Sequence, residues 1–253
     1  MNKIVKHFGV VVNSWLYVIK YFFSRKNQSC IKKLYNGVSL VITSCNRPTL
    51  LNKTLKSFKL HNTHRIDQII FIEDGGCVEC IEIFQKHFID YPNVKILINE
   101  HNNGQLKSID KAYSFVKHEY IFHLEDDWIF TRKGFIEFSK NILENNKKSI
   151  YVSLRSKNDQ NNHPFKKLNG VFYTPVPFWN GCWVGFGFNP SLRRSVDYFE
   201  YGLPFSKGNK REIGIGLVYY IKGFKVYLID KNEDAFIKHE GGAASTYEAY
   251  KKA

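Results

Sequence analysis

Short runs of apolar and β-branched residues alternate with segments of helical periodicity along the middle of the chain. Buried strands are predicted at 38–43, 68–72, 94–98 and 120–124, and helices at 49–60, 78–89 and 105–116. Strands that alternate with helices form parallel sheets with right-handed crossovers. The pattern therefore predicts an α/β fold with a mostly parallel central sheet and flanking helices.

The periodicity is weaker after residue 150. A strand is expected at 151–154, followed by a segment over 155–190 that is rich in Asn, Pro, Gly, Phe and Trp and has no helical period. Further on, helices are expected at 191–199 and 212–222, and a strand at 225–229. No repeat or low-complexity linker divides the chain, so we expect one domain over 36–253 with an appendage at 1–35.

The appendage has the pattern of an amphipathic helix. Its apolar residues recur at steps of three and four: Ile4, Phe8, Val11, Val12, Trp15, Val18, Ile19 and Phe22. Lys6, Asn13, Tyr17 and Lys20 are expected on the opposite side. The uncharged run from His7 to Ile19 is too short to span a bilayer, and no cleavage site of a signal peptide follows it. Two interpretations stay open: a helix in the membrane interface, or a helix docked on the protein's own core.

The charge of the chain is unevenly distributed. The net charge is +14, and residues 1–66 hold 12 Lys or Arg and no acid, whereas the rest of the chain holds 25 basic and 23 acidic residues. A basic block of this kind indicates an anionic partner, such as a membrane surface, a nucleic acid or a polyanionic substrate.

The five cysteines are odd in number and scattered, which argues against a disulfide framework. Cys77 and Cys80 form a lone C-x-x-C without the second pair that a zinc ribbon needs. We interpret them as free thiols in a reducing compartment.

Polar clusters follow three of the predicted strands, at Thr43–Arg47, Glu73–Gly76 and Glu125–Asp127. The carboxyl ends of parallel strands meet at one edge of a sheet, where such folds bind ligands. Consecutive carboxylates at a strand end favour a hard divalent ion, which in turn binds a diphosphate. Asp74, before two glycines, is suited to accept hydrogen bonds from a base or ribose. Taken singly, each cluster is also compatible with a solvated acidic loop or a turn.

Four of these segments together resemble family 2 of the glycosyltransferases, which have the A-type fold. They read V-S-L-V-I-T-S-C-N-R-P, I-I-F-I-E-D-G-G, N-N-G-Q-L-K-S-I-D-K-A and Y-I-F-H-L-E-D-D-W, and the resemblance extends over about residues 38–242, through R-E-I-G-I-G-L-V and F-I-K-H-E-G-G. It implies a nucleotide-binding part at 36–130 and an acceptor-binding part at 131–253. It also implies a nucleotide-sugar donor and a divalent metal, Mn²⁺ or Mg²⁺.

Residue roles follow from the same resemblance. Asp127 and His239 would hold the metal, and Glu212 would be the catalytic base. In the family this base is the second of two acids, whereas here Arg211 replaces the first; an adjacent Arg favours an ionised Glu212. The residues implied in donor binding are Thr43, Asn46, Arg47, Glu73, Asp74, Gly104, Lys107, Glu125, Asp126, Trp179 and Trp183. The composition of the basic segment 207–211, apart from the resemblance, indicates either a mobile loop that closes over the diphosphate or a solvated turn.

The implied reaction is an inverting transfer of a sugar to an acceptor hydroxyl. We expect a role in bacterial surface glycan synthesis, on lipopolysaccharide, capsule or a lipid-linked oligosaccharide. The protein is expected in the cytoplasm, on the inner face of the membrane and bound to it through residues 1–35, without a nucleic acid partner. The alternatives are another metal-dependent nucleotide-using enzyme such as a nucleotidyltransferase, a non-catalytic module that binds polyanions, and an inactive relative.

Overall fold

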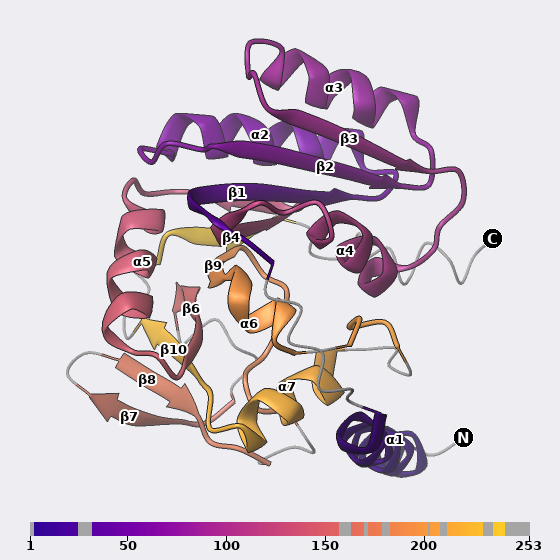
Figure 1. Cartoon of the computed structure of the whole chain (residues 1–253), viewed down its shortest axis with the longest axis vertical. Helices are drawn as coiled ribbons and strands as arrows, with labels where there is room; N and C mark the ends of the chain where they lie inside the picture. The colour runs from indigo at the N-terminus through magenta and orange to yellow at the C-terminus, as the bar shows by residue number, and fades with distance from the viewer. Residues whose placement is uncertain are drawn as a thin grey trace.

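A computed structural model gives the structure of the chain, and it describes residues 3–24, 32–156, 163–169, 172–178, 183–201, 203–207, 212–229 and 235–240. Within the first helix, side chains are described from residue 11 onward. The described elements form three sheets with helices packed around them (Figure 1).

The largest sheet has the strand order β3-β2-β1-β4-β9. Its strands are β1 (Tyr35–Ser44), β2 (Gln68–Asp74), β3 (Val94–Asn99), β4 (His118–Glu125) and β9 (Ser191–Arg194). The first four are parallel and β9 pairs antiparallel to β4, which confirms the predicted mostly parallel sheet. In the central register Ile42 lies beside Phe71 on one side and Leu124 on the other, so these three strands end at the same edge.

Alternate residues of these strands enter two separate cores. Leu40, Phe71 and Phe122 pack with α2 (Pro48–His61), α3 (Val78–Phe88) and α5 (Phe135–Asn145). Val41, Ile72 and Ile121 pack with α4 (Gln105–Tyr113) and α7 (Glu212–Ile221) on the opposite face. Figure 1 shows α2 and α3 on one side of the sheet and α4 on the other. Because both faces are covered, the strands read as continuous apolar runs in the sequence.

The second half of the chain builds a four-stranded sheet of order β6-β10-β8-β7. It contains β6 (Ser149–Ser156), β7 (Phe165–Asn169), β8 (Phe172–Pro175) and β10 (Lys225–Ile229). A short antiparallel pair, β5 (Trp128–Phe130) with β11 (Ile237–His239), brings the end of the described chain next to the end of β4. The helix predicted over 191–199 is wrong in its first half, because Ser191–Arg194 pairs with β4 and only α6 (Ser195–Phe199) is helical.

The N-terminal helix α1 (Lys3–Ser24) packs against α7, and two of its tyrosines bond to residues just after α6 and α7. The hydroxyls of Tyr17 and Tyr201 are 2.8 Å apart, and Tyr21 donates to the carbonyl oxygen of Tyr201 at 2.6 Å. Lys222 Nζ in turn donates to the Tyr21 hydroxyl at 2.8 Å. Tyr17, predicted on the side opposite the apolar stripe, is thus buried against the protein, whereas Trp15, Ile19 and Phe22 of the stripe are exposed. Val18 of the stripe is buried as well.

The exposed side of α1 is mostly apolar. We call it the α1 patch; its residues are Val12, Trp15, Leu16, Ile19, Phe22 and Phe23. Trp15 stacks on Phe178, which in turn meets the ring of Tyr220 edge-on, so the exposed apolar surface continues beyond the helix. None of the described helices has the length and hydrophobicity of a membrane span.

Cys77 and Cys80 remain thiols, as expected, and Cys80 is buried beneath the Ser44 hydroxyl. Cys30 and Cys182 lie outside the described residues.

Candidate active site

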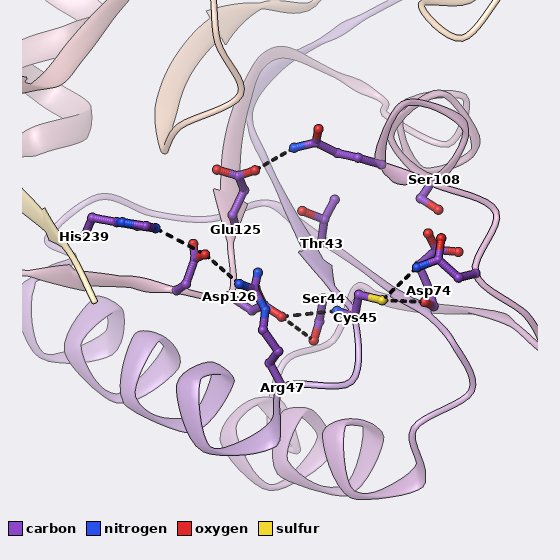
Figure 2. Close-up of a pocket in the computed structure, with 12 residues that line it drawn as sticks. Thr43, Ser44, Cys45, Arg47, Asp74, Ser108, Glu125, Asp126 and His239 are labelled. Carbon is purple, nitrogen blue, oxygen red and sulfur yellow. Dashed lines mark hydrogen bonds and ion pairs between the residues drawn. The ribbon is translucent and has the colours of Figure 1, made fainter. Parts of the chain in front are cut away.

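A pocket opens at the carboxyl edge of the large sheet, and all three predicted polar clusters contribute to it (Figure 2). Its volume is about 260 Å³, close to the lower end of the range of ligand sites. The lining residues are Thr43, Ser44, Cys45, Arg47, Asp74, Asn102, Gln105, Ser108, Glu125, Asp126, Asp127 and His239. The three strand ends therefore share one pocket, as the sequence predicted.

Arg47, immediately before α2, connects two of the acids in the pocket. One guanidinium nitrogen, Nη1, lies 2.7 Å from Asp127 Oδ2, and the other, Nη2, pairs with Asp126 Oδ1. The second oxygen of Asp126 accepts hydrogen bonds from the Ser44 hydroxyl at 3.0 Å and the Cys45 backbone N–H at 3.1 Å. Burial raises the pKa of Asp126 to about 6, although Arg47 opposes this shift.

Asp127 and His239 form a pair that fits a divalent metal. His239 lies opposite Trp128 in the β5–β11 pair, and its Nε2 is 3.3 Å from Asp127 Oδ2. Two ligand atoms that are each about 2.1 Å from one ion lie roughly 3.0–3.4 Å apart, so the separation of these two atoms is compatible with a shared ion. Among the residues that the structure describes, no group of three or more His, Cys, Asp or Glu could hold a metal. A pair of protein ligands is nevertheless sufficient for an ion that takes its other ligands from diphosphate and water.

Glu125 lies between this pair and the rest of the site. Its two oxygens accept hydrogen bonds from Gln105 Nε2 at 2.7 Å and from Trp128 Nε1 at 3.3 Å. Burial raises the pKa of Glu125 well above its ordinary value, and the charges of Asp127 and Glu212 raise it further. Glu125 is therefore held in place by two hydrogen-bond donors and lies within the electrostatic influence of Asp127 and of the expected base, Glu212.

Asp74 fixes the loop before α4. Its carboxylate accepts hydrogen bonds from the backbone N–H groups of Asn103 at 2.8 Å and Gly104 at 2.9 Å, and from Asn99 Nδ2 at 3.0 Å. Gly104 has a φ of +89°, which a glycine adopts without strain. Asp74 lines the pocket and also shapes its wall, so its contact with a nucleoside stays a prediction.

Glu73 and Asn46 lie behind the pocket wall rather than in it. Glu73 is 0% exposed, and its two oxygens accept hydrogen bonds from the backbone N–H groups of Asn46 at 2.8 Å and Cys77 at 3.0 Å. Asn46 has a φ of +53°, so Glu73 stabilises a turn that directs the chain toward Arg47. Gly104 and Lys107 are also absent from the lining, and Lys107 is exposed on α4.

Glu212, the first residue of α7, lines a neighbouring hollow together with Tyr151, Ser153, Arg155, Trp183, Gly185, Phe186, Gly187, Asn189, Val226 and Leu228. Its Oε1 accepts a hydrogen bond from the backbone N–H of Phe188 at 2.6 Å. Burial raises the pKa of Glu212, while this hydrogen bond and the charge of Arg193 lower it.

Arg193 is a residue that the sequence reasoning missed. Its guanidinium is buried and lies over the rings of Tyr151, Phe186 and Phe188, at 4.8–5.1 Å. The positive charge near Glu212 therefore comes from β9. The expected counter-charge, Arg211, lies outside the described residues, as do Trp179 and residues 208–210 of the basic segment.

Five further residues line the pocket without having been given an individual role from the sequence: Ser44, Cys45, Asn102, Gln105 and Ser108. Ser44 and Cys45 lie within the first predicted polar cluster, and the other three lie in the segment N-N-G-Q-L-K-S after β3. Because this segment follows the carboxyl end of a predicted strand, its position is a signal that could have identified them.

The fold and this acidic pocket place the protein among the α/β proteins with a mostly parallel sheet, a class that binds ligands at the carboxyl edge of the sheet. The family model "Glycosyl transferase family 2" matches residues 39–236. The chain therefore belongs to the family 2 glycosyl transferases, as its motifs predict.

Solved structures with the same fold are distant in sequence. TarS 1–349 of S. aureus is 14% identical with a TM-score of 0.54, over 78% of this chain and 61% of that one. The mannosyltransferase PcManGT of Pyrobaculum calidifontis, solved with GDP-Man and Mn²⁺, is 11% identical with a TM-score of 0.57, over 89% of this chain and 64% of that one. The chain thus spans about three fifths of the length of these two structures. A search among curated proteins finds no match.

Proposed function

We propose that the protein transfers a sugar from a nucleoside diphosphate donor to an acceptor hydroxyl, with inversion at the anomeric carbon. The observation that carries this proposal is the convergence of Asp74, Glu125, Asp126 and Asp127 from separate strand ends on one pocket, with Glu212 in the adjoining hollow. Family membership supports the reaction class, and the distant neighbours support the donor class, because their structures contain UDP, UDP-GlcNAc or GDP-Man.

Glu212 is suited to act as the general base. Its carboxylate is fixed by the Phe188 backbone and partly neutralised by Arg193, which keeps an ionised form accessible despite burial. Glu212 accepts the proton of the acceptor hydroxyl while the hydroxyl oxygen forms a bond to the anomeric carbon. The bond from that carbon to the diphosphate breaks, and the nucleoside diphosphate takes the electron pair. A single displacement of this kind inverts the anomeric configuration.

Asp127 and His239 would hold Mn²⁺ or Mg²⁺, which neutralises negative charge on the departing diphosphate. Glu125 and Asp126 are assigned to the ribose or to metal-bound water, and Asp74 to the nucleoside. Trp183 is assigned to the sugar and acceptor side, because it lines the hollow of Glu212. Its indole N–H donates to the Phe186 carbonyl at 3.2 Å, which fixes the ring for stacking.

We further propose that the acceptor is a surface glycan or lipid-linked precursor at the inner face of the bacterial membrane. The α1 patch supports this, because six apolar residues are exposed on one helix in the basic part of the chain. Interfacial helices bury such a face among lipids while nearby Lys and Arg attract anionic head groups. Since α1 packs on α7, whose first residue is Glu212, the patch lies in the acceptor half of the molecule.

Charges on the α1 patch test the membrane proposal. Ile19 and Phe23 are 52% and 89% exposed, so the double variant I19E/F23E should fold normally. It should bind vesicles that contain phosphatidylglycerol at least about tenfold more weakly than the wild type, because burial of each side chain in lipid contributes roughly 1.5–3 kcal/mol. Co-sedimentation with vesicles measures the difference.

The matched control places the same two charges on exposed apolar residues of α2 and α3. Leu60 and Ile89 are 68% and 79% exposed, and L60E/I89E should bind vesicles like the wild type. Equal binding by both double variants would show that the α1 patch does not contact the membrane.

An assay of product release tests the reaction class. The purified protein is incubated with Mn²⁺ and a panel of UDP- and GDP-sugars, and the release of nucleoside diphosphate is measured with and without glycolipid acceptors. We expect release from one donor of the panel. Release of pyrophosphate from nucleoside triphosphates would instead indicate a nucleotidyltransferase, and consumption of neither substrate would favour a binding module or an inactive relative.

A further inference from the structure

We propose that Arg47 competes with the divalent ion for Asp127, so that the metal site becomes fully available only when a diphosphate gives Arg47 another anionic partner. This inference rests on the proposed metal and donor binding. Arg47 would thereby couple the binding of the ion to the binding of the nucleotide, which Asp127 and His239 alone do not do.

The guanidinium of Arg47 contacts the carboxylate oxygen of Asp127 that faces His239. Arg47 Nη1 lies 2.7 Å from Asp127 Oδ2, the same oxygen that is 3.3 Å from His239 Nε2. An ion shared by His239 and Asp127 lies next to that oxygen. The guanidinium and the ion are both positively charged, so together at one carboxylate oxygen they repel each other.

Arg47 also forms a second ion pair, with Asp126. Its Nη2 pairs with Asp126 Oδ1, and Asp126 is fixed by Ser44 and the Cys45 backbone. Arg47 can therefore release Asp127 and keep Asp126. Figure 2 shows Arg47 rising from the start of α2 toward Asp126, within the same pocket as Thr43 and Glu125.

The carboxylates of Asp126 and Asp127 need a positive charge beside them, because both are largely buried. The side chains of Asp126 and Asp127 are only 1% and 12% exposed, so two adjacent carboxylates are largely removed from water. Unpaired buried charges are strongly unfavourable. Arg47 supplies the positive charge in the free protein, and in the donor complex the ion takes over at Asp127. Arg47 Nε is buried and has no hydrogen-bond partner among the described residues, so the part of the chain that the structure describes does not fully satisfy the guanidinium in this position.

These contacts imply weak binding of the ion alone and tighter binding in the presence of nucleoside diphosphate. A diphosphate oxygen accepts the hydrogen bond that Arg47 withdraws from Asp127, and guanidinium groups bind phosphate well. Because coupling between two ligands is reciprocal, the ion strengthens nucleotide binding by the same factor.

The test is a titration of the full chain with Mn²⁺ in the absence of nucleotide. The EPR signal of the free ion measures how much Mn²⁺ is bound. In the Arg47→Gln variant the competing charge is absent, and the dissociation constant for Mn²⁺ should fall at least about tenfold, as expected for the loss of one charge-assisted hydrogen bond. In EDTA the same variant should melt at a lower temperature than the wild type, and Mn²⁺ should raise its melting temperature more.

Arg47→Lys is the second variant, in case the glutamine variant does not fold. A single ammonium group cannot reach both carboxylates as the planar guanidinium does, so Mn²⁺ should again bind more tightly, by a smaller factor. Arg65→Gln is the matched control: Arg65 pairs with Asp67 at the opposite edge of the sheet, and its loss should leave Mn²⁺ binding unchanged.

Unchanged or weaker Mn²⁺ binding in a folded Arg47 variant would overturn the inference, even if the wild type binds the ion with nucleotide. If neither the wild type nor the variants bind Mn²⁺, with or without UDP or GDP, both the inference and the proposed metal site fail. The two failures are thus distinguishable in one titration series.

Discussion

Replacing Glu212 with Gln is expected to lower kcat for sugar transfer by about 10²–10⁴-fold, the usual contribution of a general base. The amide keeps the size of the side chain and can still accept the hydrogen bond from Phe188, but it cannot take the acceptor proton. Donor binding should therefore be unchanged, because Glu212 lies in the neighbouring hollow and not among the residues of the main pocket. Steady-state kinetics with a titration of the donor separates the two effects.

The pH profile gives an independent check on this role. Burial raises the pKa of Glu212, so the base becomes protonated at a higher pH than an exposed Glu. The wild-type kcat should fall as the pH drops through this raised pKa, and the residual activity of E212Q should lack that step. Glu82→Gln, an exposed change on α3, should behave like the wild type. If E212Q retains wild-type transfer, the base is another residue.

The second large effect is expected from Asp127→Asn. An amide is a much poorer ligand for a hard ion than a carboxylate, so turnover in Mn²⁺ should fall by roughly a thousandfold, which corresponds to about 4 kcal/mol of transition-state stabilisation. The variant should fold, because Arg47 keeps its ion pair with Asp126. The measurement is donor turnover over a range of Mn²⁺ concentrations, with EDTA as the zero point.

Asp90→Asn provides the control for Asp127, since Asp90 is exposed beyond the end of α3. It should leave both turnover and its Mn²⁺ dependence unchanged. Wild-type turnover that persists in EDTA, or an Asp127→Asn variant with normal turnover, would show that this carboxylate does not act through a metal.

The parts of the fold that could be predicted are those with a strong local pattern. Strands β1, β2 and β4 are buried on both faces, so each appears in the sequence as a mostly apolar run ending in a polar cluster, with Ser39 and His123 as buried polar exceptions. Since parallel strands end at one edge, the sequence alone predicted that Asp74 and Asp127 would line one pocket, as they do.

The parts that could not be predicted depend on partners far away in the chain. Ser191–Arg194 has no distinctive pattern and becomes a strand because it pairs with β4, about 70 residues earlier. Similarly, the periodicity of α1 left open whether its apolar stripe faces the protein core or a membrane, and the contacts of Tyr17 and Tyr21 with Tyr201 leave most of the described stripe exposed. The spacing of apolar residues shows that a helix is amphipathic, but it does not determine which part of the protein or which other surface the helix will pack against.

The same limit applies within the site. The triplet Glu125-Asp126-Asp127 indicated a cation, and in the structure the cation on Asp126 and Asp127 is the guanidinium of Arg47. Likewise, Arg193 on β9 supplies a positive charge near Glu212 that no motif indicated, and Arg211, the chain neighbour of Glu212 expected in that role, lies outside the described residues. Motifs identified which residues have the right chemistry, and only the fold determined which of them pair.

The central claim is that the acids at this sheet edge bind a diphosphate through a divalent ion, and calorimetric titration of the wild-type protein with UDP and GDP tests it most directly. With Mn²⁺ present, one of the two nucleotides should bind at a single site, and EDTA should weaken that binding at least about tenfold. Binding that is equally tight in EDTA, or no binding of either nucleotide in Mn²⁺, would contradict the account.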